Sequence, residues 1–208
     1  MKKMSYIFIT IGILTMLYPF FNNFYQSYWQ QNLLNQVDIA ESVIEDYQLL
    51  NEFFYEELDY FEEQEVDTIE RMEEVVNNSS NLLGTIEIAK INLRLPILLG
   101  TSSSNLRKAA GHLSGTNFPG EIGNSVIAAH RGRKYGVLFN RLEELEAGDK
   151  IVITTKGEKH EYTIYLKKFV EPTDLSVLNR NSKDRILTLI TCDPINNPTH
   201  RIIIHAKM

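Results

Sequence analysis

Residues Gly84 through Gly100 read GTIEIAKINLRLPILLG, and this stretch determines the kind of fold that the sequence predicts. Polar and apolar residues alternate in Thr85–Ile88 and again in Asn92–Leu95, and Pro96 closes the second run. A period of two is typical of a β-strand with one buried face. The stretch therefore predicts two consecutive short strands.

The same texture continues to the end of the chain. Short apolar runs are separated by turn-rich segments such as Gly115–Gly120 and Lys156–Glu158. Many short strands with little long helix favour a mainly β fold, a barrel or a sandwich, from about residue 82 onward. The further predicted strands are Ser125–Ala129, Lys150–Thr155, Glu161–Val170, Ile186–Thr191 and Arg201–Ala206, with short helices over Ser104–Ala110 and Phe139–Glu146.

Charge divides the chain into an acidic and a basic part, which the net charge of −6 conceals. Residues 22–80 hold 15 Asp and Glu against one basic residue, Arg71, whereas residues 81–208 hold 18 Lys and Arg against 12 acids. The basic residues are scattered and no nucleic-acid-binding motif accompanies them. We therefore expect no nucleic acid as a partner.

Within the acidic part, apolar residues recur at gaps of three and four. This spacing predicts one long amphipathic helix with acids on its other face. Its apolar stripe needs a partner surface, for which the basic domain is the obvious one. The run Asn77–Asn81 breaks the pattern and predicts a linker. The stripe consists of Leu33, Val37, Ala40, Ile44, Tyr47, Leu50, Phe54, Leu58 and Phe61.

The N-terminus predicts the compartment. Lys2 and Lys3 precede an uncharged run whose apolar part, residues 6–21, would nearly cross a hydrocarbon core of ~30 Å as a helix. Aromatic residues follow it and no small-x-small cleavage site does, so we expect an uncleaved anchor with the N-terminus in the cytoplasm and the remainder of the chain outside the cell. We divide the chain into a cytoplasmic tail and transmembrane anchor (1–28), an acidic helical stem and linker (29–81) and a β domain (82–208).

Cys192 is the one cysteine of the chain, which excludes an internal disulfide. In an exported protein, a lone cysteine is either a reactive thiol or a small buried hydrophobe, and the count leaves both open. Cys192 directly follows the predicted strand Ile186–Thr191. A strand end is rigid and yet can be exposed, which suits a nucleophile.

A nucleophilic thiol needs a proton acceptor or a cationic neighbour, because the thiolate is the attacking species. Of the five histidines, His130 is best placed, since it ends the apolar run Val126–Ala129. Acyl transfer also needs positive charge where the oxyanion develops, and Arg201 begins the strand after Cys192. Taken singly, the histidine could also be an ordinary hydrogen-bonded polar residue, and the arginine could be a solvated charge at the barrel rim.

Several motifs together resemble one family. Thr188–Cys192, TLITC, is similar to the TLxTC motif of sortases, and Ala129–Gly132, AHRG, is similar to their GHRG motif. Gly111–Pro119 resembles the family's GHLxGTxxP stretch, and Gly84–Gly100 resembles its first two barrel strands. The resemblance covers nearly all of residues 84–208. It implies a sortase-like eight-stranded β-barrel with short helices, preceded by the transmembrane helix and the amphipathic stem.

The resemblance also implies a reaction, transpeptidation at an LPxTG-like sorting signal through a thioester on Cys192. His130 would act as the acid, Arg201 would hold the substrate backbone and the oxyanion, and Thr191 would assist as a substrate-binding or oxyanion residue. An amine would resolve the thioester, either a pilin lysine or a peptidoglycan amine. No metal and no organic cofactor are implied.

The segment that follows Cys192 favours one subclass of the family. Asp193–Arg201, DPINNPTHR, resembles the TCTPxxxNTHR pattern of class C, the pilin-polymerising sortases, and predicts pilus assembly rather than cell-wall anchoring. Class C enzymes usually carry an Asp-Pro-aromatic lid, but this chain has no proline between Pro19 and Pro96. We therefore expect a site that is open, or one that the acidic stem or the linker shields.

Two functions from other classes remain open. An extracellular cysteine hydrolase, such as a peptidase or an L,D-transpeptidase-like wall enzyme, also pairs histidine with cysteine on a β-scaffold. A non-catalytic membrane-tethered adaptor would use the acidic helix for docking.

Overall fold

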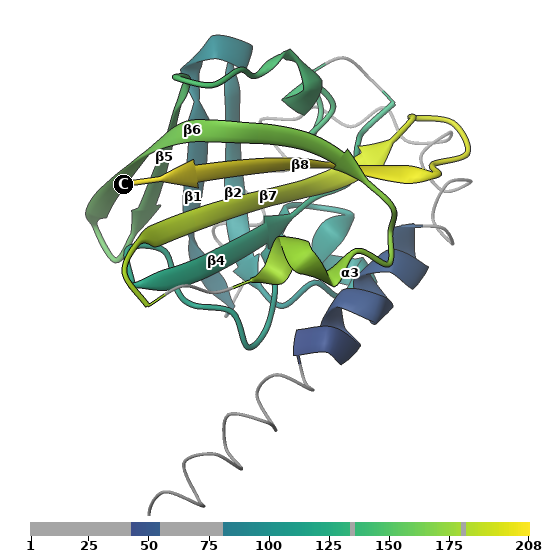
Figure 1. Cartoon of the computed structure of the whole chain (residues 1–208), viewed down its shortest axis with the longest axis horizontal. Coiled ribbons are helices and arrows are strands. Elements are labelled where there is room, and N and C mark those ends of the chain that lie inside the picture. The colour runs from purple at the N-terminus through teal and green to yellow at the C-terminus, as the bar shows by residue number, and fades with distance from the viewer. Residues whose placement is uncertain (1–42, 55–80, 134–135, 180–181) are drawn as a thin grey trace, which may run out of the picture. The chain divides into compact units, whose positions relative to one another are not determined.

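The computed structural model describes residues 43–54, 81–133, 136–179 and 182–208, and its centre is a closed β-barrel (Figure 1). The eight strands follow one another in the order β1-β2-β3-β4-β7-β8-β6-β5, which confirms the predicted barrel. The strands are β1 (Leu82–Ile88), β2 (Leu93–Leu99), β3 (Ala110–His112), β4 (Gly123–Ala128), β5 (Lys150–Thr155), β6 (Glu158–Val170), β7 (Arg185–Asp193) and β8 (His200–Lys207). The short helices are η2 (Ala89–Ile91), α3 (Ser103–Leu106), η3 (Leu142–Glu144) and η4 (Leu175–Leu178).

Gly84 through Gly100 form the first strand pair, β1 and β2, as the alternation predicts. The two strands are antiparallel, and Ile86 lies opposite Leu95 with both side chains buried. The turn η2 joins them and ends at Asn92, whose φ of 49° is a left-handed conformation that asparagine tolerates better than most residues.

The segment after β2 differs from the prediction. The expected helix over Ser104–Ala110 is the shorter α3, and Ala110 begins β3, a strand of three buried residues. Three residues are too few to display an alternation, so the pattern did not reveal this strand. Gly111 permits the close approach of the chain here, since a Cβ on it would lie 2.7 Å from the Gly100 carbonyl oxygen. The second expected helix, Phe139–Glu146, is likewise reduced to η3.

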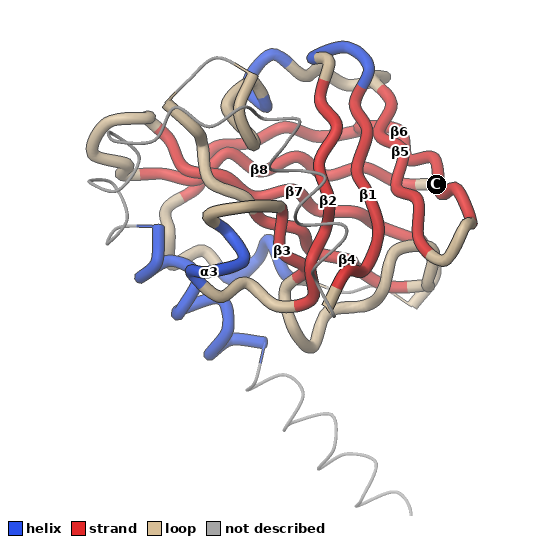
Figure 2. The backbone as a smooth tube through the Cα atoms, turned by 180° about the vertical axis from the view of Figure 1, so that it is seen from behind, coloured by secondary structure: helices blue, strands red, loops and turns tan. Residues whose placement is uncertain are grey.

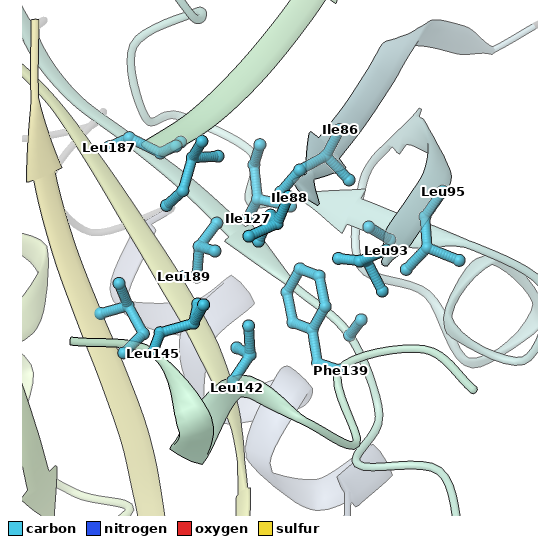
Figure 3. Close-up of a cluster of buried hydrophobic side chains, with 14 of the residues drawn as sticks. Ile86, Ile88, Leu93, Leu95, Ile127, Phe139, Leu142, Leu145, Leu187 and Leu189 are labelled. Carbon is cyan, nitrogen blue, oxygen red and sulfur yellow. The ribbon is translucent and has the colours of Figure 1, made fainter. Parts of the chain in front are cut away.

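The barrel interior is filled by aliphatic side chains from alternate positions of the strands (Figure 3). Each fully buried side chain of this kind contributes about 1.5–3 kcal/mol relative to an exposed one. The connection between β4 and β5 supplies an aromatic ring and three leucines to the same cluster. The residues labelled in Figure 3 are Ile86, Ile88, Leu93, Leu95, Ile127, Phe139, Leu142, Leu145, Leu187 and Leu189.

A helix over residues 43–54 packs on the outer face of the barrel and belongs to the same compact unit, residues 42–208 (Figures 1 and 2). It is the described part of the predicted stem. Its apolar stripe is buried against side chains of β4, β7 and β8, the surface that the sequence analysis expected it to meet. The helix contributes Val43, Tyr47, Leu50 and Phe54 to this cluster, and the three strands contribute Val126, Ala128, Ile190, Cys192 and Ile203.

The stripe of the helix differs from the prediction at one position. Tyr47, Leu50 and Phe54 are buried as predicted, but Ile44 is 37% exposed and Val43, at 6%, takes its place. Gaps of four, three and four residues keep Val43 on the face of the other three, whereas Ile44 lies about 100° further round the helix.

The predicted anchor over residues 1–28 and the rest of the predicted stem lie outside the described residues. Within the part of the chain that the structure describes, no helix has both the length and the apolar character needed to cross a bilayer. The division of the chain at residues 28 and 81 stays a prediction.

A buried polar network links β4, β7 and β8. The Thr188 hydroxyl donates a hydrogen bond to Asn124 Oδ1 at 2.8 Å and lies 2.9 Å from His205 Nδ1. Since the hydroxyl proton goes to Asn124, we assign the proton of the neutral imidazole to Nδ1. Burial lowers the pKa of His205 from 6.5 to about 4, and the positive charge of Lys168 adds to this effect.

This histidine predicts a loss of stability in mild acid. Between about pH 6.5 and about pH 4 the unfolded chain binds a proton at His205 that the folded chain does not, so stability should fall as the pH falls through this window. His205→Asn keeps a nearby donor but does not titrate, and its urea midpoint should fall less over the same interval. His200→Asn, at an exposed position of β8, is the matched control. Equal pH dependence of the wild type and His205→Asn would contradict this explanation.

Candidate active site

The strands β7 and β8 place Cys192 and Arg201 side by side. The strands are antiparallel, and these two residues are direct cross-strand partners. Directly opposed side chains lie on the same face of a sheet, which here is the outer face of the barrel. Cys192 is a free thiol that is 6% exposed, and the Arg201 side chain is fully buried.

The strand β4 brings His130 to the same place. It runs parallel to β7, and its last residue, Ala128, is paired with Ile190. Two residues further along both strands come His130 and Cys192, so the register at the end of the pairing directs both residues to the same edge of the barrel. The backbone of His130 is fixed from the other side, because its carbonyl accepts a hydrogen bond from the amide of Phe139 at 3.0 Å.

The helix packed on the barrel covers these residues. The ring of Phe54 lies 5.2 Å from the His130 ring, centroid to centroid, and its centroid lies 5.2 Å from Arg201 Cζ. Arg201 Nε donates to Asn51 Oδ1 at 2.8 Å, and Asn51 Nδ2 donates to the Pro172 carbonyl at 2.9 Å. Of the two expectations for this site, open or shielded by the stem, the structure has the second.

Burial controls the chemical state of the thiol. It raises the pKa of Cys192 from 9.0 to about 11, while the positive charges of Arg201 and Arg131 act in the opposite direction and the negative charge of Asp193 adds to the rise. With the helix in place, the thiol is therefore protonated at neutral pH. Replacement of the helix side chains by water or a peptide would reduce this burial and so favour the reactive thiolate.

Thr191 faces away from Cys192, because successive side chains of a strand alternate between its faces. Its side chain is fully buried and its hydroxyl donates to the Ala129 carbonyl at 2.8 Å. This geometry favours a structural role, in which Thr191 holds the segment before His130 against β7, over the substrate contact that the family resemblance implied.

Sequence reasoning assigned no role to Arg131, Asp193 or Glu143. Arg131, adjacent to His130, forms ion pairs with Asp193, adjacent to Cys192, and with Glu143. Opposite charges immediately after two candidate catalytic residues are a signal that the sequence does contain.

A cavity of about 610 Å³ adjoins the covered site. It lies between the helix and the segment 171–175, and Asn51 and His200, both hydrogen-bonded to Arg201, are among its lining residues. The hydrogen bond between Asn51 and Arg201 therefore lies next to open space.

The grouping of a thiol, an imidazole and a guanidinium is suited to acyl transfer. The thiol supplies the nucleophile, the imidazole can exchange protons with it and with a leaving group, and the guanidinium can stabilise an oxyanion. All three groups come from strand ends at one edge of the barrel, so a rigid scaffold positions them.

The covering helix predicts a slow reaction of the thiol with alkylating agents. Phe54→Ala removes the ring that packs on His130 and Arg201, so water should reach Cys192 and its pKa should fall. A fall of one unit raises the thiolate population at about pH 8 about tenfold, and alkylation by iodoacetamide should accelerate by a similar factor. Leu49→Ala, at a position of the same helix that is 46% exposed, is the matched control. An unchanged rate in Phe54→Ala would show that the ring does not shield the thiol.

Comparison with known proteins places the barrel in a family. The sortase domain matches residues 86–208, which is more than half of the 208 residues. Sortase D of Bacillus subtilis is 35% identical over 127 residues, which cover 60% of this chain and 62% of that protein. Sortase A of Listeria monocytogenes is 28% identical over 100% of this chain and 90% of that protein. The solved pilus-related sortase C of Group B Streptococcus is 37% identical, with a TM-score of 0.58 over 63% of this chain and 69% of that one. The chain therefore belongs to the sortase family of transpeptidases.

Proposed function

We propose that this chain cuts an LPxTG-like sorting signal after its threonine and joins the threonine to an amine. The observation that carries the proposal is the grouping of Cys192, His130 and Arg201 at one edge of a sortase barrel, two of them as direct cross-strand partners. These are the positions at which the chain resembles the family's TLxTC and GHRG motifs and its arginine.

In the first half of the reaction, the Cys192 thiolate attacks the carbonyl carbon of the threonine. Arg201 stabilises the oxyanion of the tetrahedral intermediate by charge and hydrogen bonding. When the peptide bond breaks, His130 in its protonated form donates its proton to the departing glycine nitrogen. The products of this half are a free glycine amine and a thioester between the threonine and Cys192.

In the second half, an amine attacks the thioester. Neutral His130 accepts a proton from the amine, a new amide bond forms, and Cys192 leaves as the thiolate. The enzyme therefore returns to its starting state, and the reaction needs no external energy source because one amide replaces another.

The covering helix must move before a peptide binds. Asn51 occupies Arg201 Nε, and Phe54 packs on both Arg201 and His130, so the helix holds the groups that a substrate would contact. The contacts that fasten the described part of the helix include two hydrogen bonds of the Asn51 side chain, with Arg201 and with the Pro172 carbonyl, and four buried apolar residues, which is compatible with reversible release.

We propose a pilin lysine as the acceptor amine. The similarity to the pilus-related sortase C and the arginine nine residues after Cys192 in DPINNPTHR support it. The competing acceptor is a peptidoglycan amine. The alignment with a sortase A over 90% of that protein's length favours this second candidate.

The proposed nucleophile can be tested by mass spectrometry. The wild type, mixed with an LPxTG-type peptide, should gain the mass of the acyl fragment, and Cys192→Ala should not. Cys192 supplies the bond that forms the intermediate, so transfer of the peptide to an added amine should also stop in the variant. Transfer at the wild-type rate in Cys192→Ala would refute the assignment, and formation of free acid alone in the wild type would indicate a hydrolase.

The acceptor can be tested in a competition. We expect the enzyme, given a substrate protein that carries a sorting signal, pilin subunits and a peptidoglycan-type amine together, to form covalent ladders of pilin on denaturing gels. Substitution of the acceptor lysine in the pilin should abolish the ladders. Single attachment of the substrate to the peptidoglycan amine, without ladders, would reject the pilin lysine and support a cell-wall-anchoring function.

A further inference from the structure

We propose that Arg131 and Asp193 form a clamp that holds His130 and Cys192 at the separation that acyl transfer requires. The two clamp residues are positioning residues, because each acts through its neighbour in the sequence and need not touch the substrate. The inference rests on the proposed function of His130 and Cys192.

The clamp joins the two catalytic segments directly. Arg131 Nη1 donates to Asp193 Oδ1, and these residues immediately follow His130 and Cys192. The Arg131 side chain is 5% exposed and the Asp193 side chain 25%. A pair that is this well shielded from solvent is screened by salt much less than a surface pair, so it can hold a fixed geometry.

The other contacts of Arg131 fix the position of its backbone and of its guanidinium. Its Nη2 donates to Glu143 Oε2, and its backbone forms an isolated bridge with Leu138. Asn140 Nδ2 donates to the Gly132 carbonyl in the next residue of the loop. The guanidinium is therefore held by the loop that follows β4, and its bond to Asp193 transmits this position to the end of β7.

The clamp lies where the backbone pairing of β4 and β7 ends. The amide of Ala129 donates to the Ile190 carbonyl at 3.2 Å, and the Thr191 hydroxyl donates to the Ala129 carbonyl. Beyond these bonds the Arg131–Asp193 ion pair joins the two strand ends. His130 and Cys192 thus lie between a tether before them and a tether after them.

The charges of the clamp argue for a role in position rather than in activation. Arg131 lowers the pKa of Cys192 and Asp193 raises it, so the two effects on the thiol oppose each other. A residue selected only to activate the thiol would not bring a carboxylate next to it. The effect of the pair that is not cancelled is the fixed distance that it sets between the two strand ends.

Four variants of the full chain separate position from charge: Asp193→Ala, Asp193→Asn, Arg131→Met, and Arg131→Met combined with Asp193→Ala. Asp193→Ala removes both the charge and the hydrogen-bond acceptor, and kcat for an LPxTG-type peptide should fall about 10- to 100-fold with little change in KM, as for a small misplacement of reacting groups. Asp193→Asn removes the same charge but keeps an acceptor in place, so its kcat should fall much less. Arg131→Met combined with Asp193→Ala should be no worse than the more damaging single change.

The pH profile of Cys192 alkylation is the second readout. Asp193→Ala and Asp193→Asn should both lower the thiol pKa, because each removes the nearby negative charge. A purely electrostatic role for Asp193 would therefore give both variants the same kcat, equal to or above that of the wild type. That result, or a kcat of Asp193→Ala within twofold of the wild type, would overturn the clamp.

A matched control and a substrate-free measurement complete the test. Glu144→Ala breaks a comparable ion pair, with Arg141, and should leave kcat unchanged. In nuclear magnetic resonance spectra, alkylation of Cys192 should shift the His130 ring signals in the wild type and in Asp193→Asn, and clearly less in Asp193→Ala. Equal shifts in all three proteins would overturn the clamp, whether or not the enzyme turns over a peptide. A lack of peptide turnover would by itself reject only the proposed function. Urea denaturation confirms that each variant is folded.

Discussion

The parallel pairing of β4 with β7 is the constraint on which the site depends. Its register, with Ala128 opposite Ile190, leads His130 to Cys192, and the antiparallel pairing of β7 with β8 adds Arg201. A slip of one residue would turn the thiol into the barrel interior, because side chains alternate along a strand. The aliphatic side chains that fill the interior oppose such a slip, so the same packing that stabilises the barrel positions the candidate catalytic groups.

Burial and reactivity conflict at this site. Covering the thiol raises its pKa, and a covered guanidinium needs hydrogen-bond acceptors, which Asn51 and the His200 carbonyl provide to Arg201. The apolar stripe of the helix offsets the desolvation of these groups by burying its own side chains. In the covered form the thiol is therefore poorly reactive. Phe54 and Asn51 couple the position of the helix to the exposure of His130 and Arg201.

The residues that flank the candidate nucleophile connect its strand to the segment that carries His130. Thr191 is tied to Ala129, and Asp193 is tied to Arg131, so Cys192 lies between two side-chain links to the segment that carries His130. A strand end that is held in this way can present a thiol beyond the point where its backbone pairing with β4 ends. Rigid support from neighbours that do not react is what precise acyl transfer requires.

Seven of the eight strands, and the face of the helix that Tyr47, Leu50 and Phe54 share, could be predicted from the sequence, and the family motifs singled out the three candidate catalytic residues. These features depend on local periodicity and on chemical type, which neighbouring residues display. Four features follow only from the folded arrangement: β3 exists, Val43 rather than Ile44 is buried, the helix covers Arg201, and Arg131 meets Asp193. Each of these depends on which surfaces meet across long sequence separations, and strand register and helix docking are set by packing of the whole core rather than by any local pattern.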